Sequence, residues 1–286
     1  MDGKLRGAFI FIVSFFCASI SVNAQAVMLD TAQSKFLEVG DVRLHYKSYG
    51  KGDVVILLHG AMEYWREWKN QIPDLTKKGF NVIVLDTRGH GLSSYSDTKI
   101  TYDLLTKDLL IFINKLNVEK PHLVGFGDGG IIALKAALTQ PDRIGKIAII
   151  GTNAQADTNA VFPEVFQKVK EWDLDKMTFY LQMKFKENPN PKRLKDFAQQ
   201  MQLLLLNEPN ISESELKSIK NQTLIMVGDN DFIKQSHTNS LFSSIPNAYL
   251  SIIPAASHYA IKERPKIVNA TLIDFLSNSY SKPKKY

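Results

Sequence analysis

The sequence of 286 residues predicts a doubly wound α/β fold, a mostly parallel sheet with helices on both faces and one helical insertion. Short apolar runs alternate with amphipathic stretches between residues 53 and 151, as expected for strands buried on both faces and the helices that join them. The same alternation returns from residue 223. Between these two parts, residues 155–220 contain no strand candidate, which predicts an insertion.

The first half of the fold opens with a loosely alternating segment that predicts a β-hairpin or a pair of edge strands over 36–49. Buried strands follow at 53–58, 81–86 and 146–151, because each is a continuous apolar run. Helical spacing predicts helices over 65–78, ended by Gly79, and over 102–116. A short strand at 123–124 leads through a glycine-rich turn into a helix over 130–139, which ends before Pro141.

The second half repeats this order, with strands expected at 224–227 and 249–253 and helices at 235–243 and 265–277. The segment 155–220 is rich in Phe, Met and Leu. We expect it to form a helical cap over the carboxyl edge of the sheet, in one domain that spans 25–286. The alternative is that its helices pack on the sheet as ordinary crossovers, but the segment is far longer than one crossover needs.

The first 24 residues predict a secretory signal peptide. Lys4 and Arg6 give a positive start, residues 8–20 are mostly apolar, and cleavage is expected after Ala24. A membrane anchor is the alternative, but the apolar run is shorter than the ~20 residues that span a bilayer. The protein is therefore expected to be exported, periplasmic or secreted. Cys17, the only cysteine, leaves with the signal, so no thiol nucleophile or disulfide remains.

The composition of the chain limits the classes of binding partner that can be expected. The formal net charge of +6 is modest and spread along the chain, and the basic residues 282–285 are expected to be a solvated end. Nucleic-acid binding needs a clustered basic stripe, so no nucleic-acid partner is expected. No His, Asp and Glu cluster has metal-ligand spacing, and no phosphate-binding loop is evident, so neither a metal nor another cofactor is expected. After cleavage no integral membrane segment is expected.

The turn at 125–129 carries the main chemical signal. Gly125-Phe126-Gly127-Asp128-Gly129 follows a short strand and precedes a helix. A Gly-x-Ser-x-Gly segment in this setting forms a nucleophile elbow, which lifts a serine oxygen out of the sheet. Both flanking glycines are present here, but Gly127 occupies the serine position and offers no side chain.

Three other strand ends carry groups that could act with this turn. His59-Gly60-Ala61-Met62 can aim the backbone N–H of Ala61 or Met62 inward. With the backbone N–H of Asp128, this N–H would form an oxyanion hole. Gly228-Asp229-Asn230-Asp231 supplies a carboxylate and Ser257-His258 an imidazole. A carboxylate fixes the tautomer of a histidine and thereby makes it a general base.

Together these segments resemble the α/β-hydrolase superfamily, in particular its esterase-like and lipase-like members with a helical cap. The resemblance covers about 39–277, and the order of elbow, acid and histidine agrees with the family. It implies the following sites: His258 and Asp231 as catalytic base and acid, Gly127 at the nucleophile position, Ala61 and Asp128 in the oxyanion hole, and Gly60, Met62 and Phe126 at the binding site. Asp229 is the alternative acid.

The departure from the family at Gly127 leaves alternatives open. A shifted register would make Asp128 the nucleophile, as in relatives similar to dehalogenases and epoxide hydrolases, but Phe126 would then occupy a position that needs a small residue. With Gly127 at the tip, the turn loses a strain of roughly 1–3 kcal/mol that serine carries there. Losing the serine costs a triad enzyme roughly 10⁶-fold in turnover.

Three functional hypotheses follow. The first is an exported, esterase-like protein whose covalent hydrolysis is absent or very weak, with residual general-base chemistry of His258 and Asp231 on a small apolar molecule such as an ester. The second is a non-catalytic small-molecule-binding protein or receptor. The third is an ordinary esterase in which serine has been replaced by Gly127. Whether the protein is an enzyme stays open at this point.

The remaining aromatic and imidazole side chains have structural interpretations. His45, His122 and His237 are expected to be structural or exposed, and His59 and His90 to hold backbone in turns. Trp65 and Trp68 are expected in the core, whereas Trp172 could line a pocket.

Overall fold

The computed structural model describes Leu29 and residues 32–282, and one compact unit begins at Lys35. The predicted signal peptide and most of the basic end therefore lie outside the described residues. Within the described part, no helix is both long enough and apolar enough to cross a membrane.

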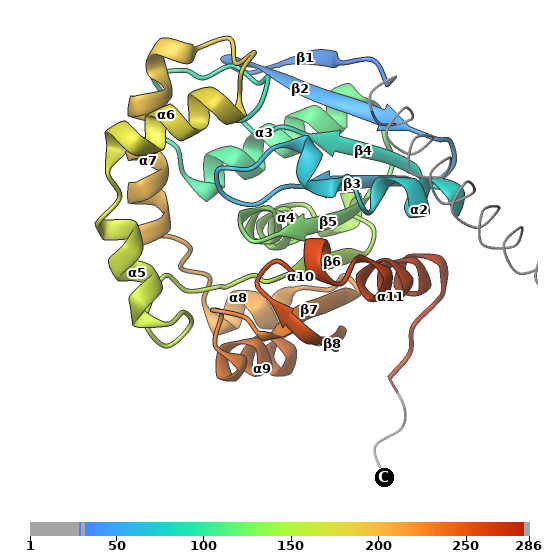
Figure 1. Cartoon of the computed structure of the whole chain (residues 1–286). Coiled ribbons are helices and arrows are strands. Elements are labelled where there is room, and N and C mark those ends of the chain that lie inside the picture. Colours follow the sequence, from blue (N-terminus) through green and yellow to red (C-terminus); the bar gives the residue numbers. More distant parts are fainter. Residues whose placement is uncertain (1–28, 30–31, 283–286) are drawn as a thin grey trace, which may run out of the picture. The chain divides into compact units, whose positions relative to one another are not determined.

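An eight-stranded sheet forms the centre of the unit, in the order β1-β2-β4-β3-β5-β6-β7-β8 (Figure 1). The six strands from β4 to β8 are parallel, and β2 joins β4 and β1 by antiparallel pairing. The predicted fold class is confirmed. The strands are β1 (Lys35–Val39), β2 (Val42–Tyr49), β3 (Val54–Leu58), β4 (Asn81–Leu85), β5 (His122–Phe126), β6 (Ile147–Ile150), β7 (Thr223–Asn230) and β8 (Ala248–Ser257).

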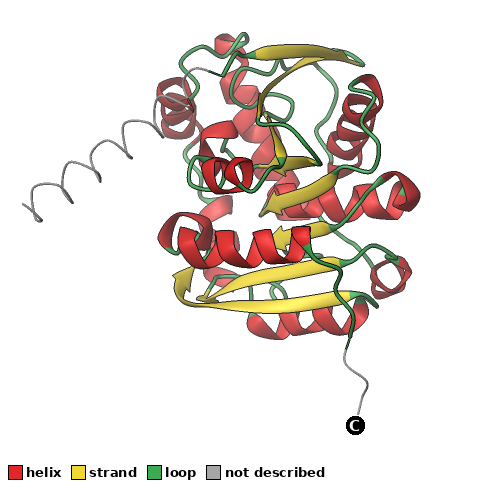
Figure 2. Cartoon of the chain, turned by 90° about the vertical axis from the view of Figure 1, so that its right-hand side faces the viewer, coloured by secondary structure: helices red, strands yellow, loops and turns green. Residues whose placement is uncertain are grey.

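Helices cover both faces of the sheet (Figures 1 and 2). The chain moves one way across the sheet through α2 and the opposite way through α3, α4 and α9. Because such crossovers are right-handed, α2 lies on the face opposite to the other three. Helix α11 packs against α2 and belongs to that face. The bounds are α2 (Ile72–Lys77), α3 (Tyr102–Lys115), α4 (Asp128–Thr139), α9 (Gln235–Ser244) and α11 (Pro265–Ser277).

A helical segment lies between β6 and β7, and Figure 1 shows α5, α6 and α7 together along one edge of the molecule. Of two isolated bridges here, the first closes the segment on itself and the second joins it to the loop after β7. Gln155 pairs with Asn210 and Val161 pairs with Ile233, both antiparallel. The helices are α5 (Pro163–Lys170), α6 (Leu174–Lys184), α7 (Leu194–Asn207) and α8 (Glu213–Ser218), with a 3₁₀ turn η3 (Pro191–Arg193) before α7.

Some expected boundaries are wrong. The single helix over 65–78 is divided into a 3₁₀ turn η1 (Trp65–Trp68) and α2, because Pro73 has no N–H to donate and fits only in the first turn of a helix. Helix α4 begins at Asp128, two residues earlier than expected. The short helix α10 (Ala260–Glu263) was not expected at all.

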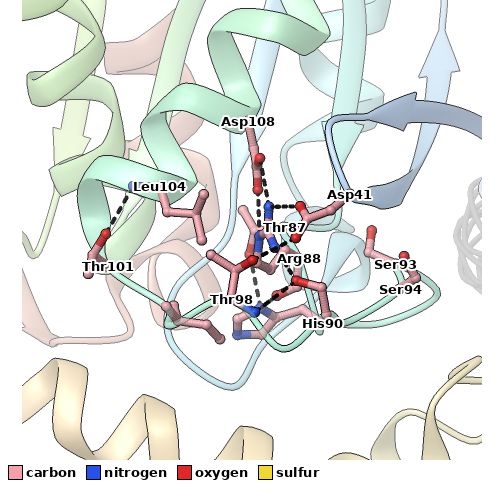
Figure 3. Close-up of polar contacts among 12 residues, drawn as sticks. Asp41, Thr87, Arg88, His90, Ser93, Ser94, Thr98, Thr101, Leu104 and Asp108 are labelled. Atoms are coloured by element: carbon pink, nitrogen blue, oxygen red, sulfur yellow. Dashed lines mark hydrogen bonds and ion pairs between the residues drawn. The ribbon is translucent and has the colours of Figure 1, made fainter.

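The turn after β4 is held by a buried guanidinium (Figure 3). Arg88 is 1% exposed and binds Asp108 of α3 at 2.8 Å from Nε and Asp41 of the β1–β2 turn at 2.9 Å from Nη2. This network fixes the turn against two neighbouring elements. The expected role of His59 is confirmed, since its Nε2 accepts the N–H of Thr87 at 3.0 Å.

Candidate functional site

Gly127 forms the tip of a tight turn between β5 and α4. It has φ 51° and ψ −116°, a conformation that residues with a side chain adopt only under strain. At Gly125 and Gly129 glycine is required for a different reason, because other backbone atoms lie too close to leave room for a Cβ. A Cβ on Gly129 would lie 2.0 Å from the carbonyl oxygen of Leu58, and one on Gly125 would lie 2.2 Å from the backbone of Gly129. Glycine at these positions therefore allows α4 to pack closely against the sheet.

The space above Gly127 is open toward an imidazole. A Cβ built on Gly127 would meet Gly60 Cα and His258 Nε2, each at 3.7 Å, and nothing closer. These are ordinary contact distances, so the site has room for a side chain. Residue 127, and not Asp128, is at the tip, because Asp128 is the first residue of α4.

The imidazole of His258 is paired with a carboxylate. Its Nδ1 lies 2.9 Å from Asp231 Oδ1, which also accepts the backbone N–H of Ile233 at 2.9 Å. The Asp231 side chain is 1% exposed and that of His258 12%. With Nδ1 engaged by the carboxylate, Nε2 is the nitrogen that faces the tip.

Asp229, the alternative acid, has a different task. Its carboxylate accepts the backbone N–H groups of Ala255 and Ala256 at 2.9 and 3.0 Å, and these hydrogen bonds lower its pKa. Asp229 therefore ties the end of β7 to β8 and does not contact the imidazole. Of the two candidates, the structure pairs only Asp231 with His258.

Aromatic rings enclose the His258 imidazole. The ring of Phe232 stacks on it at 3.9 Å between centroids with a 26° interplanar angle, and Phe126 lies at 4.8 Å on another side. A Cβ on Gly151 would lie 2.8 Å from His258 Nδ1, so glycine there leaves space for the ring. The sequence analysis missed Phe232, although it directly follows Asp231 in the chain.

The two backbone donors expected for an oxyanion hole are placed beside the tip. Ala61 follows Gly60, whose carbonyl accepts the N–H of Glu63 in a turn at 3.2 Å, and Met62 holds that turn with φ 56°. Asp128 is the first residue of α4, and the N–H groups of a first helical turn have no intrahelical partner. Among the turn and loop contacts of the described residues, neither Ala61 nor Asp128 donates its N–H to a backbone carbonyl, and the N–H of Asp128 lies near its own carboxyl.

A cavity of about 370 Å³ opens above this tip. One side is built by strand ends: Gly60, Met62, Phe126, Gly127, Gly151 and His258 all line it. The other side comes from the helical segment and is mainly apolar, with Val161, Val165, Phe166, Val169, Trp172, Met177 and Leu205. The sheet therefore contributes the polar chemistry of the cavity, and the helices contribute its apolar wall. Trp65 and Trp68 are buried in the core, as expected.

Charged residues occupy one border of the cavity. Lys184 of α6 binds Glu63 at 2.7 Å, and Lys262 of α10 binds the buried Glu67 at 2.7 Å. Burial raises the pKa of Glu67 to about 7, while Lys262 opposes that shift. These pairs link the helical segment, the turn that carries Ala61 and the loop after His258.

A second carboxyl lines the cavity at the start of α4. Asp128 Oδ2 and Tyr102 Oη, at the starts of α4 and α3, are both buried, and the Tyr102 hydroxyl acts as a hydrogen-bond donor to the Asp128 carboxyl. Burial raises the pKa of Asp128 to about 7, which the nearby Tyr102 hydroxyl and the backbone N–H of Asp128 oppose. Burial, followed by the Asp128 charge, raises the pKa of Tyr102. The sequence analysis considered the backbone N–H of Asp128 and, in a shifted register, its carboxylate as the nucleophile, but not a buried carboxyl paired with Tyr102.

The other histidines are engaged elsewhere. His45 Nδ1 lies 2.8 Å from Asp86, His122 Nδ1 accepts the N–H of Lys146, and His237 Nε2 accepts the N–H of Ala154. His90 Nδ1 lies 2.9 Å from Thr87 Oγ1. No group of three or more His, Cys, Asp or Glu residues in the described part of the chain could hold a metal ion.

Comparisons with known proteins identify the family of the fold. Residues 53–196 match the family described as the alpha/beta hydrolase fold. The chain is 28% identical to the 2-hydroxy-6-oxononadienedioate/2-hydroxy-6-oxononatrienedioate hydrolase of Comamonas testosteroni, with 87% of this chain and 98% of that protein covered. It is also 38% identical over 113 residues to the bifunctional epoxide hydrolase 2 of Sus scrofa, which covers 39% of this chain and 20% of that protein.

Solved structures give the same fold. A putative lipase from Acinetobacter baumannii AYE superposes with a TM-score of 0.73 at 25% identity and covers 86% of this chain and 91% of its own. A meta-cleavage product hydrolase from Pseudomonas fluorescens IP01 gives a TM-score of 0.71 at 20% identity, with 85% and 97% covered. At such identities the likeness of this second structure concerns the fold alone.

Proposed function

Because this chain belongs to the family with the alpha/beta hydrolase fold, we propose that it is an esterase-like protein that has lost covalent catalysis and retains a general base. Its ligand is a small, mainly apolar molecule of the ester or acyl class. Gly127 supplies no attacking oxygen, so hydrolysis through a covalent acyl intermediate is absent or very weak. The imidazole of His258, oriented by Asp231, keeps the ability to take up a proton.

One observation carries the proposal: a Cβ on Gly127 would lie 3.7 Å from His258 Nε2. A nucleophile-bearing side chain is missing, while the base that would activate it is in position. The Asp231–His258 hydrogen bond and the stacked Phe232 hold that base in one orientation. These contacts support a base that is still usable.

Residual activity would proceed by direct attack of water. A water molecule in the space above Gly127 gives a proton to His258 Nε2, and its oxygen attacks the carbonyl carbon. The carbonyl oxygen becomes negative and is stabilised by the N–H groups of Ala61 and Asp128. The alkoxy group then leaves with the proton from Nε2, which gives a carboxylic acid and an alcohol. General-base assistance of this kind contributes roughly 10²–10⁴-fold.

The second candidate function is a non-catalytic small-molecule-binding protein. The apolar wall from α5, α6 and α7 favours it, because such a wall retains a ligand without any chemical step. Export through a signal peptide over 1–24 is part of both proposals, and it is supported by Lys4, Arg6 and the apolar run that follows them.

Gly127→Ser tests the proposal directly. We expect the natural chain to hydrolyse p-nitrophenyl butyrate near background and Gly127→Ser to show a burst of p-nitrophenol followed by turnover. The gain should reach several orders of magnitude, since the nucleophile of a triad contributes roughly 10⁶-fold. Gly127→Ala is the matched control, because it adds the same Cβ without the oxygen.

The outcomes separate the alternatives. Equal activity of the natural chain and Gly127→Ser contradicts the lost-nucleophile proposal. Slow hydrolysis by the natural chain that disappears in His258→Ala supports direct attack by water. Saturable binding of the ester with no hydrolysis above buffer, in both the natural chain and His258→Ala, supports the binding protein.

A further inference from the structure

We propose that the protein transfers acyl groups from a small ester to a small primary alcohol, whose hydroxyl lies above Gly127 where water lies in hydrolysis. The inference rests on the proposed function, because it uses the same base, His258, and the same cavity. It goes beyond that function in naming the acceptor, which makes the product a new ester in place of a carboxylic acid.

The first ground is the scarcity of polar partners above the tip. Apart from the chain neighbours of Gly127, the described residues place two atoms within 4 Å of a Cβ built there, Gly60 Cα and His258 Nε2. The backbone of Gly127 is already engaged, because its N–H donates to Ile150 O and its carbonyl accepts the N–H of Gly130, each at 2.9 Å. A buried water makes about three hydrogen bonds, so a water above the tip lacks partners.

The other backbone groups beside this space are also committed. The N–H of Gly60 donates to Glu67 Oε2 at 3.4 Å. The N–H groups of Ala61 and Asp128 are assigned to the carbonyl oxygen of the ester and therefore do not hold the attacking group. Within the 4 Å shell of described atoms, His258 Nε2 is the partner left for a hydroxyl. An alcohol has one O–H to donate, so this single acceptor satisfies it.

The second ground is the apolar character of the walls near the tip. The Phe126 ring lies against Gly60, since a Cβ there would be 2.9 Å from Phe126 Cδ1, and Phe232 stacks on the imidazole at 3.9 Å between centroids. Val161 and Phe166 line the same cavity. The alkyl chain of an alcohol gains free energy by burial against such surfaces, whereas a water has no apolar surface to bury.

The third ground is room for two reactants. The cavity has a volume of about 370 Å³. Pockets of roughly 300–1,000 Å³ hold drug-sized ligands, and a short ester and a short alcohol together contain no more atoms than such a ligand. The cavity therefore admits both reactants at once and limits both to short chains.

The transfer needs no covalent enzyme intermediate. The alcohol gives its hydroxyl proton to His258 Nε2 while its oxygen forms a bond to the carbonyl carbon of the ester. The carbonyl oxygen becomes negative and binds the N–H groups of Ala61 and Asp128. The bond to the original alkoxy group then breaks, and this group leaves with the proton from Nε2. A new ester and a new alcohol result, and nothing is oxidised or reduced.

Product analysis with p-nitrophenyl butyrate and 1-butanol tests the proposal. With the natural chain, we expect p-nitrophenol release to rise with 1-butanol concentration to saturation, without a burst, and butyl butyrate to exceed butyric acid in gas chromatography. From methanol to 1-butanol, each added CH₂ should raise kcat/KM for the alcohol by about fourfold, because each buried CH₂ contributes ~0.8 kcal/mol. 2-Methylpropan-2-ol, with the same four carbons and a hindered hydroxyl, controls for solvent effects.

Gly127→Ala places a methyl group in the space above the tip and should lose most of the acceleration by 1-butanol. Gly40→Ala, at another turn with positive φ and free space, is the matched control and should keep it. His258→Ala should form butyl butyrate no faster than buffer does. Thermal melting shows whether each variant is folded. Equal acceleration in the natural chain and folded Gly127→Ala overturns the proposal. So does butyric acid as the main product of the natural chain at saturating 1-butanol, a result that needs no variant.

This design separates acyl transfer from the proposed function. Slow p-nitrophenol release that depends on His258 but not on 1-butanol refutes the transfer and leaves the retained base. Release no faster than in buffer, with and without 1-butanol, refutes the transfer and the retained base together. A burst of p-nitrophenol from the natural chain reveals a covalent acyl intermediate, which refutes the loss of covalent catalysis and the direct transfer that depends on it.

Discussion

The two sides of the site differ in what builds them. The tip side, 125–130, is made almost entirely of backbone: its glycines permit the turn and the close approach of α4 to β3. The imidazole side is made of side chains, with Asp231, His258 and Phe232 held by a hydrogen bond, a stack and an accepted backbone N–H. The tip therefore keeps its shape without a reactive atom, while the imidazole side keeps its reactive atoms in contact.

The shape of the turn at Gly127 and the reactivity of the Asp231–His258 pair are therefore specified by different residues. The turn at Gly127 is specified by residues that also determine the packing of the sheet, so folding alone maintains it. The pairing of Asp231 with His258 contributes to the orientation of one ring and to little else in the fold. Variants that change one side at a time show whether each side functions independently.

The largest effect is expected at the acid. In the Gly127→Ser background, Asp231→Asn should lower ester hydrolysis by roughly 10⁴-fold, as loss of the acid does in a Ser-His-Asp triad, because the histidine is no longer held in the required tautomer. The burst rate with p-nitrophenyl butyrate measures it. Asp229→Asn is the matched control, being the same change two residues away on the same strand end. Similar losses in the two variants would contradict the assignment of the acid.

The next effect concerns stability and the second carboxyl of the cavity. The folded state raises the pKa of Asp128 from its ordinary 3.8 to about 7. The folded protein then holds this proton more tightly than the unfolded chain. The free energy of unfolding should therefore fall as pH rises from about 4 to about 7 and stay level above that range.

Asp128→Asn removes this penalty and should stabilise the ligand-free protein by roughly 2–4 kcal/mol at pH 8, with little change at pH 4. Urea unfolding at the two pH values gives the difference. Asp142→Asn, at an exposed carboxyl, should follow the unsubstituted chain. If Asp128→Asn gains no more at pH 8 than at pH 4, Asp128 is not a buried, uncompensated acid.

The smallest effect isolates the backbone of the tip. Gly127→Ala should destabilise the protein by roughly 1–3 kcal/mol, because alanine is strained at φ 51° although its Cβ has room. Thermal unfolding, compared with Gly40→Ala at another exposed turn with positive φ and free space, tests whether the cost is general to such turns. A neutral Gly127→Ala would mean that serine carries no strain there.

Much of the sheet could be predicted from the sequence. Strands β3, β4 and β6 are continuous apolar runs, and burial on both faces of a parallel sheet leaves no alternative use for them. The order of the elbow, Asp231 and His258 was also readable, because each follows a strand and parallel strands present their carboxyl ends at one edge. Helix boundaries were less accurate, since Pro73 permits either an early stop or a restart.

The pairing of Asp128 with Tyr102 could not be predicted in the same way. Asp128 and Tyr102 are 26 positions apart and are the first residues of two different helices, α4 and α3. No periodicity connects two helix starts, and their proximity depends on how tightly α4 packs on the sheet. Likewise, the stack of Phe232 on His258 depends on the path of the β7 loop, which a local pattern does not specify.

The bridge between Val161 and Ile233 has a mechanical consequence. Around it, Phe162 N–H donates to Phe232 O at 3.2 Å and Lys234 N–H donates to Ala160 O at 2.8 Å. The segment that contributes Val161 to the cavity wall is therefore hydrogen-bonded to the loop that carries Asp231 and Phe232. A ligand that displaces this wall would also displace Asp231, which orients the imidazole of His258. Occupation of the cavity and orientation of the imidazole are therefore coupled.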